Sequence, residues 1–320
     1  MSTKKLVIPR NIDPTLTEKI KSIIPAWEVF VGKEKEIWID QLQDAEIIAG
    51  WTKEIEKKCM CRKPHLRWLQ TWSAGVNSIP LDEFSKREIT VTSANGVHSF
   101  PISETIFALM LGLTRKIHTY VRNQQTKTWE NAGLKLEMHN KTIGIIGVGA
   151  IGKETAKIAK AFGMKVLGVR HSGAPEADVD QMYTQHELNT VLPQCDYVVI
   201  TLPLTNETKQ MFSNRQFELM KDSSFFINIG RGEIVVEADL IEALTHGQIA
   251  GAGLDVFEVE PLPEDSPLWE MENVIITPHT SGATEHYNQR LIEEIFIPNL
   301  KNYVAGTPLS INVVDYEKGY

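Results

Sequence analysis

Glycines in the spacing G-x-G-x-x-G directly follow an apolar run. The segment reads Gly147-Val-Gly149-Ala150-Ile151-Gly152, after a strand predicted at 142–147 and before a helix predicted at 153–162. In this context the first glycine permits a tight turn, the second lets the backbone approach a pyrophosphate, and the third allows close packing of helix on strand. The helix N-terminus offers free N–H groups to phosphates. The segment therefore predicts a dinucleotide site, and a glycine turn without a ligand is the alternative.

The residues after the next predicted strand, Lys165–Val169, indicate which dinucleotide binds. This strand ends in Arg170-His171-Ser172, with no carboxylate. A carboxylate at this place would accept ribose hydroxyls and repel a 2′-phosphate. An arginine instead binds phosphate with two donors, and a serine hydroxyl can donate as well. We expect a preference for NADP(H), with NAD(H) possible. In the alternative, Arg170 stacks on the adenine and tolerates NAD.

Short apolar runs alternate with helical stretches on both sides of this segment. Before residue 100, strands are predicted at 5–8, 27–31, 46–50, 66–72 and 89–94. After residue 140, they are predicted at 142–147, 165–169, 197–202, 224–228, 250–256 and 274–277. Such alternation is typical of parallel sheets covered by helices.

Several helices have recognisable ends. Asp13 can cap a helix over 14–23, Ser213 and Gln216 form a capping box before a helix over 214–221, and Gly247 ends a helix over 237–246. A long helix is predicted over 99–124 and a last one over 285–304. We therefore predict an α/β protein of two doubly wound parallel-sheet domains. A Rossmann domain covers 99–287, and a smaller flavodoxin-like domain covers 1–98 and 288–320, to which the last helix returns.

The composition fits a folded globular chain that is not a general binder of polyanions. Of its 320 residues 42% are hydrophobic, and the net charge of −8 argues against nucleic acid as a partner. No signal-like apolar core opens the sequence, and its longest helical apolar stretch, 106–113, is too short to span a bilayer. Cys59, Cys61 and Cys195 suggest neither a disulfide framework nor a zinc site. We expect a cytoplasmic protein with unpaired cysteines, no membrane contact and no metal.

Motifs recur in order along the second half, each at the end of a predicted strand. They are Gly147–Gly152, Asn228-Ile-Gly-Arg231-Gly232, Leu254-Asp255-Val-Phe-Glu-Val-Glu260-Pro261 and Thr277-Pro278-His279-Thr-Ser281-Gly-Ala283. With these motifs the chain resembles the D-isomer-specific 2-hydroxyacid dehydrogenases over nearly its whole length, and most of all their glyoxylate/hydroxypyruvate reductases. The resemblance implies hydride transfer between a nicotinamide dinucleotide and a small 2-keto or 2-hydroxy acid, with D-stereospecificity.

The resemblance implies that Arg231, Glu260 and His279 carry the chemistry, and their types agree. Arg231 follows the end of a buried strand, where its planar fork suits a carboxylate and the neighbouring carbonyl oxygen. His279 can donate a proton to the developing alkoxide. Glu260 would orient the imidazole and favour its protonated form. The alternatives are a structural salt bridge for Arg231 and a loop histidine without catalytic role.

The resemblance also assigns binding residues. Asp255 would orient the nicotinamide carboxamide, with turn capping as the alternative. Arg231 and His279 would contact both cofactor and substrate. The loop Ser73-Ala74-Gly75-Val76 of the smaller, substrate domain would receive the substrate carboxylate through Ala74 and Gly75, unless it is a simple turn. The remaining residues along the cofactor would be Leu202, Pro203, Thr208 and Ile229.

The same resemblance implies a homodimer. The segment 124–131, with Trp129, matches the region that packs across the family's dimer, although Trp129 could also lie in its own domain's core. Competing activities are 3-phosphoglycerate dehydrogenase and formate dehydrogenase; the latter uses Gln where Glu260 stands. A dinucleotide-sensing corepressor scaffold is the non-enzymatic alternative. His98, His118 and His186 lack any matching motif, and we expect them to be structural or solvated.

Overall fold

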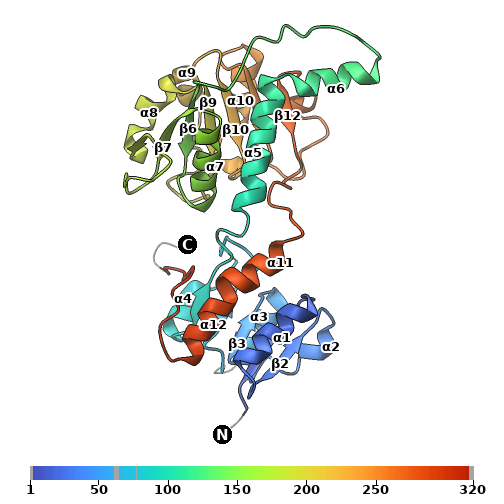
Figure 1. Ribbon diagram of the computed structural model, residues 1–320, viewed down its shortest axis with the longest axis vertical. Helices are drawn as coiled ribbons and strands as arrows, with labels where there is room; N and C mark the ends of the chain where they lie inside the picture. The colour runs from blue at the N-terminus through green and yellow to red at the C-terminus, as the bar shows by residue number, and fades with distance from the viewer. Residues whose placement is uncertain (1–2, 61–64, 77, 317–320) are drawn as a thin grey trace. The chain divides into compact units, whose positions relative to one another are not determined.

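The computed structural model describes residues 3–60, 65–76 and 78–316. Its internal contacts divide the chain into two compact units, one formed by residues up to Val97 and from Thr284 onward, the other by His98–Ala283. Each unit is built on one parallel β-sheet with helices packed on it (Figure 1). The predicted α/β fold class is confirmed.

The smaller unit has a sheet in the order β2-β1-β3-β4-β5, with every pair parallel. Its strands are β1 (Lys5–Ile8), β2 (Glu28–Val31), β3 (Ile47–Ala49), β4 (Trp68–Gln70) and β5 (Thr90–Thr92). The helices between them are α1 (Pro14–Ile23), α2 (Lys35–Trp38), α3 (Lys53–Met60) and α4 (Leu81–Lys86). This strand order is that of flavodoxin-like folds.

Local signals set the start of α1, as the sequence predicts. Asp13 accepts a hydrogen bond from the Thr15 backbone N–H at 2.7 Å, and Pro14 takes the first helical position. The bond to Asp13 satisfies an N–H group that has no partner inside the helix, and Pro14 has no N–H group that would need one. The helix then buries Leu16 and Ile20 against the sheet.

The C-terminal helix belongs to the smaller unit. It runs through α11 (Tyr287–Arg290), a π-helical stretch η5 (Leu291–Phe296) and α12 (Ile297–Val304), close to the predicted 285–304. Phe296 stacks on Trp68 of β4, with ring centroids 4.9 Å apart. Burial of these apolar residues against the sheet explains why the chain returns to this unit at its end.

The larger unit has a sheet in the order β12-β11-β10-β9-β6-β7-β8, again parallel throughout. The strands are β6 (Thr142–Ile146), β7 (Lys165–Val169), β8 (Gln181–Tyr183), β9 (Tyr197–Ile200), β10 (Phe225–Asn228), β11 (Gly251–Leu254) and β12 (Val274–Ile276). Strand β8 was not predicted from the sequence. The order reverses between β6 and β9, which is the switch point where doubly wound sheets bind ligands.

Helices cover this sheet, and they pack around its wholly buried central strands. The helices are α5 (Ser99–Thr114), α6 (Ile117–Gln125), α7 (Ala150–Ala161), α8 (Leu188–Val191), α9 (Asn214–Leu219) and α10 (Glu237–Thr245), with short 3₁₀ turns η1 (Gln185–Glu187), η2 (Leu192–Gln194), η3 (Gly232–Ile234) and η4 (Pro267–Trp269). The capping box of Ser213 and Gln216 is present before α9. None of the described helices is long and apolar enough to cross a membrane.

The single long helix predicted over 99–124 is wrong. The structure has two helices, because Lys116 adopts a left-handed conformation with φ of 55° and ends the run. The apolar periodicity of α5 stops at Leu113, and α6 buries none of its side chains. Without a core to pack against, nothing holds the chain in the direction of α5.

The described cysteines are buried and free. Cys59 lies in the core of the smaller unit and Cys195 in that of the larger one. Burial raises the pKa of both thiols to about 12, which keeps them protonated and unreactive. Cys61 lies outside the described residues.

Candidate active site

The glycine loop at the end of β6 has a separate physical reason for each glycine. Gly147 has φ of 112°, and a Cβ there would lie 2.9 Å from the backbone N of Leu202. A Cβ on Gly152 would lie 2.4 Å from the Gly147 carbonyl oxygen, so the first turn of α7 packs directly on the loop. Around Gly149, in contrast, no described residue other than its chain neighbours has an atom within 4 Å of such a Cβ. The middle glycine therefore faces open space.

Helix α7 starts earlier than predicted, which bears on phosphate binding. It begins at Ala150 rather than Lys153, with Gly149 as its N-cap. Ala150, Ile151 and Gly152 therefore form its first turn, where backbone N–H groups lack partners inside the helix. The loop and this helix end together supply the donors that a pyrophosphate needs.

The structure brings a carboxylate, that of Glu176, to the end of β7, although no acidic residue directly follows the strand in the sequence. Arg170 directs Nη1 at Oε2 of Glu176, 3.3 Å away, and donates from Nη2 to the carbonyls of Ala174 and Pro175. The next loop residues are exposed: the Ser172 hydroxyl accepts a bond from the backbone of Ala174, and His171 points to solvent. The loop after β7 thus brings Glu176 back to the end of the strand. The residues that directly follow the strand carry no sign of this contact.

The loop after β9 lies beside the glycine loop. The Thr208 hydroxyl donates to the Pro203 carbonyl at 2.7 Å and accepts from the backbone of Thr205, so the turn is closed by its own side chain. Leu202 touches both Gly147 and Gly230, since a Cβ on Gly230 would lie 2.8 Å from the Leu202 carbonyl. Ile229, next to Gly230 and directly after β10, is buried at the same edge of the sheet. The residues expected along a cofactor therefore gather at the carboxyl ends of β6, β9 and β10.

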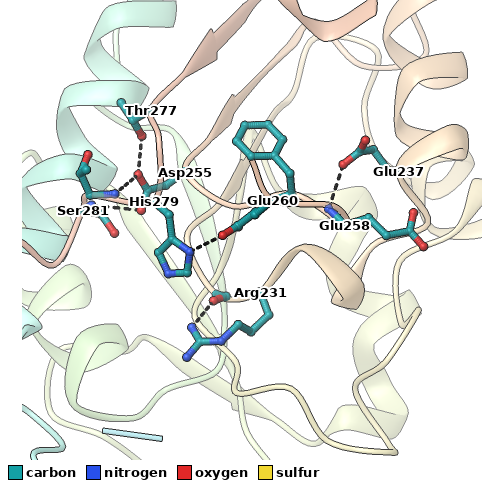
Figure 2. Close-up of polar contacts among 11 residues, drawn as sticks. Arg231, Glu237, Asp255, Glu258, Glu260, Thr277, His279 and Ser281 are labelled. Atoms are coloured by element: carbon teal, nitrogen blue, oxygen red, sulfur yellow. Dashed lines mark hydrogen bonds and ion pairs between the residues drawn. The ribbon is translucent and has the colours of Figure 1, made fainter. Parts of the chain in front are cut away.

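His279 and Glu260 form a hydrogen-bonded pair (Figure 2). His279 Nδ1 lies 2.7 Å from Glu260 Oε2, while Glu260 Oε1 accepts from the Phe257 backbone N–H at 3.0 Å. Both carboxylate oxygens are therefore engaged, which fixes the carboxylate and with it the imidazole ring. The side chains are 48% and 35% exposed, so a ligand can reach them. Because Nδ1 bonds Glu260, Nε2 is the ring nitrogen of His279 that remains for a ligand.

Arg231 extends below this pair (Figure 2). Its Nη1 donates to the Gly230 carbonyl at 2.7 Å, and among the described residues it forms no ion pair with a carboxylate. The structural salt bridge weighed as an alternative is therefore not seen in that part of the chain. Asn228 fixes the turn that carries Arg231, since its side chain donates to the Arg231 carbonyl and accepts from the Gly230 N–H, each at 3.1 Å.

The loops carrying Arg231 and Glu260 touch backbone to backbone. A Cβ on Gly232 would lie 1.9 Å from the carbonyl carbon and oxygen of Phe257, which no side chain could fit. Glu237, the first residue of α10, accepts a hydrogen bond from the Glu258 backbone N–H at 3.0 Å. The positioning roles of three residues were not predicted from the sequence: Asn228, Gly232 and Glu237. The first two lie in a quoted motif, whereas nothing near Glu237 signals its role.

Asp255 holds the loop on which His279 lies. Its carboxylate is fully buried and accepts from the Thr277 hydroxyl at 2.6 Å and from the backbone N–H groups of Thr280 and Ser281 at 3.0 Å. Its carbonyl also accepts from the His279 N–H at 2.8 Å. The turn-capping alternative therefore describes what this carboxylate does, and a contact with a nicotinamide stays a prediction.

The other expected positions lie elsewhere in the fold. Ala74 and Gly75 are exposed in the loop after β4 of the smaller unit. Trp129 is fully exposed, so it does not lie in its own unit's core. His98 and His118 bond backbone carbonyls within the larger unit, and His186 lies in the short turn η1.

A family model described as the NAD-binding domain of D-isomer-specific 2-hydroxyacid dehydrogenases matches residues 107–281. The chain belongs to this family. It is therefore an oxidoreductase, and its larger unit is the dinucleotide-binding domain.

Relatives of this family member match it over almost its full length. Glyoxylate/hydroxypyruvate reductase B of Serratia proteamaculans is 34% identical over 309 residues, 94% of this chain and 95% of the relative. A solved family protein from Aeromonas salmonicida is 32% identical, with a TM-score of 0.84, over 98% of this chain and 100% of that one. An NADPH-dependent glyoxylate/hydroxypyruvate reductase from Sinorhizobium meliloti, solved with NADP and sulfate, is 26% identical with a TM-score of 0.80 over the whole of both chains.

The Glu237 contact yields a test of how the site is positioned. Glu237→Ala removes the acceptor for the Glu258 N–H and should lower kcat for dehydrogenase turnover roughly two- to tenfold, the effect of one lost hydrogen bond. Glu237→Gln keeps an acceptor oxygen and should restore most of the rate. Glu242→Ala, at an exposed position of the same helix, is the control. Equal rates for Glu237→Ala and the control would show that this contact does not position the site.

Proposed function

We propose that this chain is an NADPH-dependent reductase of small 2-keto acids of the glyoxylate and hydroxypyruvate type. The observation that carries the proposal is the His279–Glu260 pair, at 2.7 Å, beside an arginine without a carboxylate partner among the described residues. Arginine, carboxylate and imidazole on adjacent loops supply an electrophile and a proton donor. The named relatives, all matched over nearly their full length, add support.

In this proposal each residue has one task. The bound dinucleotide supplies the hydride. Arg231 binds the substrate carboxylate and polarises the keto oxygen. His279 donates a proton from Nε2 to the alkoxide that forms on this oxygen, and Glu260 holds the ring through Nδ1 and favours the imidazolium. The reverse oxidation uses the same groups, with His279 as the base.

The two units would divide the binding. The larger unit takes the dinucleotide along its glycine loop, with Leu202, Pro203, Thr208 and Ile229 beside it. The smaller unit acts as the substrate domain, where the backbone N–H groups at Ala74 and Gly75 receive the substrate carboxylate. The preference for NADP(H) over NAD(H) is supported by Arg170 at the end of β7 and by the NADP bound to the Sinorhizobium relative. Buried, free Cys59 and Cys195 agree with a cytoplasmic location.

The proposed activity predicts which compounds the protein reduces. NADPH oxidation should be fast with glyoxylate and hydroxypyruvate, slower with phenylpyruvate and branched 2-keto acids, and lower in kcat/KM when NADH replaces NADPH. Absorbance at the NADPH band measures each rate. A flat trace with every keto acid would contradict the proposal and favour a dinucleotide-sensing scaffold, whereas a clear NADH preference would overturn the cofactor assignment alone.

The proton donor predicts a pH dependence for keto-acid reduction. The rate should fall at high pH, because a general acid must be protonated to donate. Glu260→Gln removes the negative charge beside the ring, so the imidazolium loses stabilisation and the falling limb should move to lower pH. His279→Ala should lower kcat roughly a hundredfold or more. An unmoved limb in Glu260→Gln would exclude Glu260 from this role.

A homodimer is also part of the proposal. Trp129 is fully exposed and follows α6, in which Ile117 and Val121 are each about half exposed, so the surface of this segment carries three large apolar side chains. Exposed aromatic residues of this kind anchor interfaces. We assign this surface to a second copy of the chain, in line with the match of residues 124–131 to the family's dimer region.

Replacement of Trp129 tests the homodimer. The native chain, of 36.1 kDa, should sediment at twice its mass, and Trp129→Ser should raise the dimer dissociation constant roughly thirtyfold, as expected for loss of an interface anchor. Val304→Ser, at a half-exposed position of α12, should leave the mass unchanged. A monomeric native chain, or equal masses for both variants, would contradict this assignment.

A further inference from the structure

Cationic side chains from two elements converge on one carboxylate oxygen at the carboxyl end of β7. Lys153, in the first turns of α7, places Nζ 2.9 Å from Glu176 Oε2. Arg170, directly after β7, places Nη1 3.3 Å from the same oxygen. Two cations that meet at a single point form an anion site, and in this structure Glu176 is the anion.

The loop between β7 and β8 delivers this glutamate. Arg170 donates from its second terminal nitrogen to the carbonyls of Ala174 and Pro175, just before Glu176. Glu176 is largely covered, with 20% of its side chain exposed, whereas Lys153 is 52% exposed. A short loop therefore holds the carboxylate between the two cations. Because Lys153 is half exposed, a ligand in solvent can still reach it.

Glu176 is ionised, but it does not bond every donor of Arg170. The hydrogen bond from Lys153 lowers the pKa of Glu176 below its usual value, so the carboxylate is charged at neutral pH. Arg170 Nε is buried and has no hydrogen-bond partner among the described residues. A carboxylate on a tether thus fails to satisfy all five guanidinium donors, and a phosphate group, with three oxygens, offers more acceptors.

We propose that Lys153 and Arg170 together bind the 2′-phosphate of NADP(H), and that Glu176 is a tethered carboxylate that occupies this site until the phosphate displaces it. The inference rests on the proposed use of NADP(H). NAD(H), which lacks the phosphate, leaves the glutamate in place. The affinity for NADP(H) therefore includes the displacement of Glu176, and this residue sets how strongly the chain prefers one dinucleotide.

Binding of 2′,5′-ADP and 5′-AMP to the full chain, measured by calorimetry without a keto acid, tests the proposal. Glu176→Gln removes the competing charge and should lower the dissociation constant of 2′,5′-ADP roughly threefold or more while that of 5′-AMP stays the same. Lys153→Gln should raise the 2′,5′-ADP constant about tenfold, again without effect on 5′-AMP. Thermal melts check that each variant is folded.

Glu154→Gln is the matched control. It removes the same charge one residue from Lys153, but its carboxylate pairs with Lys157 instead. If Glu154→Gln and Glu176→Gln lower the dissociation constant of 2′,5′-ADP equally, the effect comes from the overall charge of the chain, and the proposal is overturned. Weaker 5′-AMP binding in Glu176→Gln would overturn it as well, because the glutamate would then be a ribose ligand.

The outcome is independent of the catalytic proposal. A chain that reduces no keto acid can still show the selective response to 2′,5′-ADP, which would support the phosphate site and refute only the activity. A chain that reduces glyoxylate while Glu176→Gln and Lys153→Gln leave both constants unchanged would refute the phosphate site and keep the activity.

Discussion

The buried carboxylate of Asp255 is the constraint on which the candidate active site depends. A charge withdrawn from water is tolerated only when donors surround it, and here all three donors come from the segment 277–281. The loop therefore has little choice of conformation. His279, which lies inside it with φ of 53°, is held in a left-handed backbone conformation that a free loop would rarely adopt.

The remaining parts of the site are joined to this loop by close backbone packing. Gly232 lets the Arg231 turn rest on Phe257, the Phe257 N–H holds Glu260, and Glu260 holds the ring of His279. Because β10, β11 and β12 are neighbouring parallel strands, the loops at their carboxyl ends meet at one edge of the sheet. A guanidinium, a carboxylate and an imidazole from distant parts of the sequence are thereby brought to the same edge of the sheet.

Much of the fold was predictable because its signals are local. Apolar runs gave β1 and β7 at their observed bounds, and the cap at Asp13 gave the start of α1. The predictions failed where tertiary packing, and not the local sequence, determines the structure. The apolar pattern of α5 stops at Leu113, but the sequence runs on into polar α6 without a break in helix propensity, so the left-handed turn at Lys116 was missed. The three-residue strand β8, with one buried side chain, was too short to detect.

The sequence by itself determined the residue types of the site and their places after strands, since strand periodicity and the glycine spacing are properties of neighbouring residues. Only the tertiary structure decided which groups meet. It placed Asp255 under the His279 loop rather than at an open edge, and it returned Glu176 to Arg170 across a loop that contains Gly173 in a left-handed conformation. Such contacts depend on the path of the chain through space, and a linear pattern carries no information about the direction in which a loop turns back.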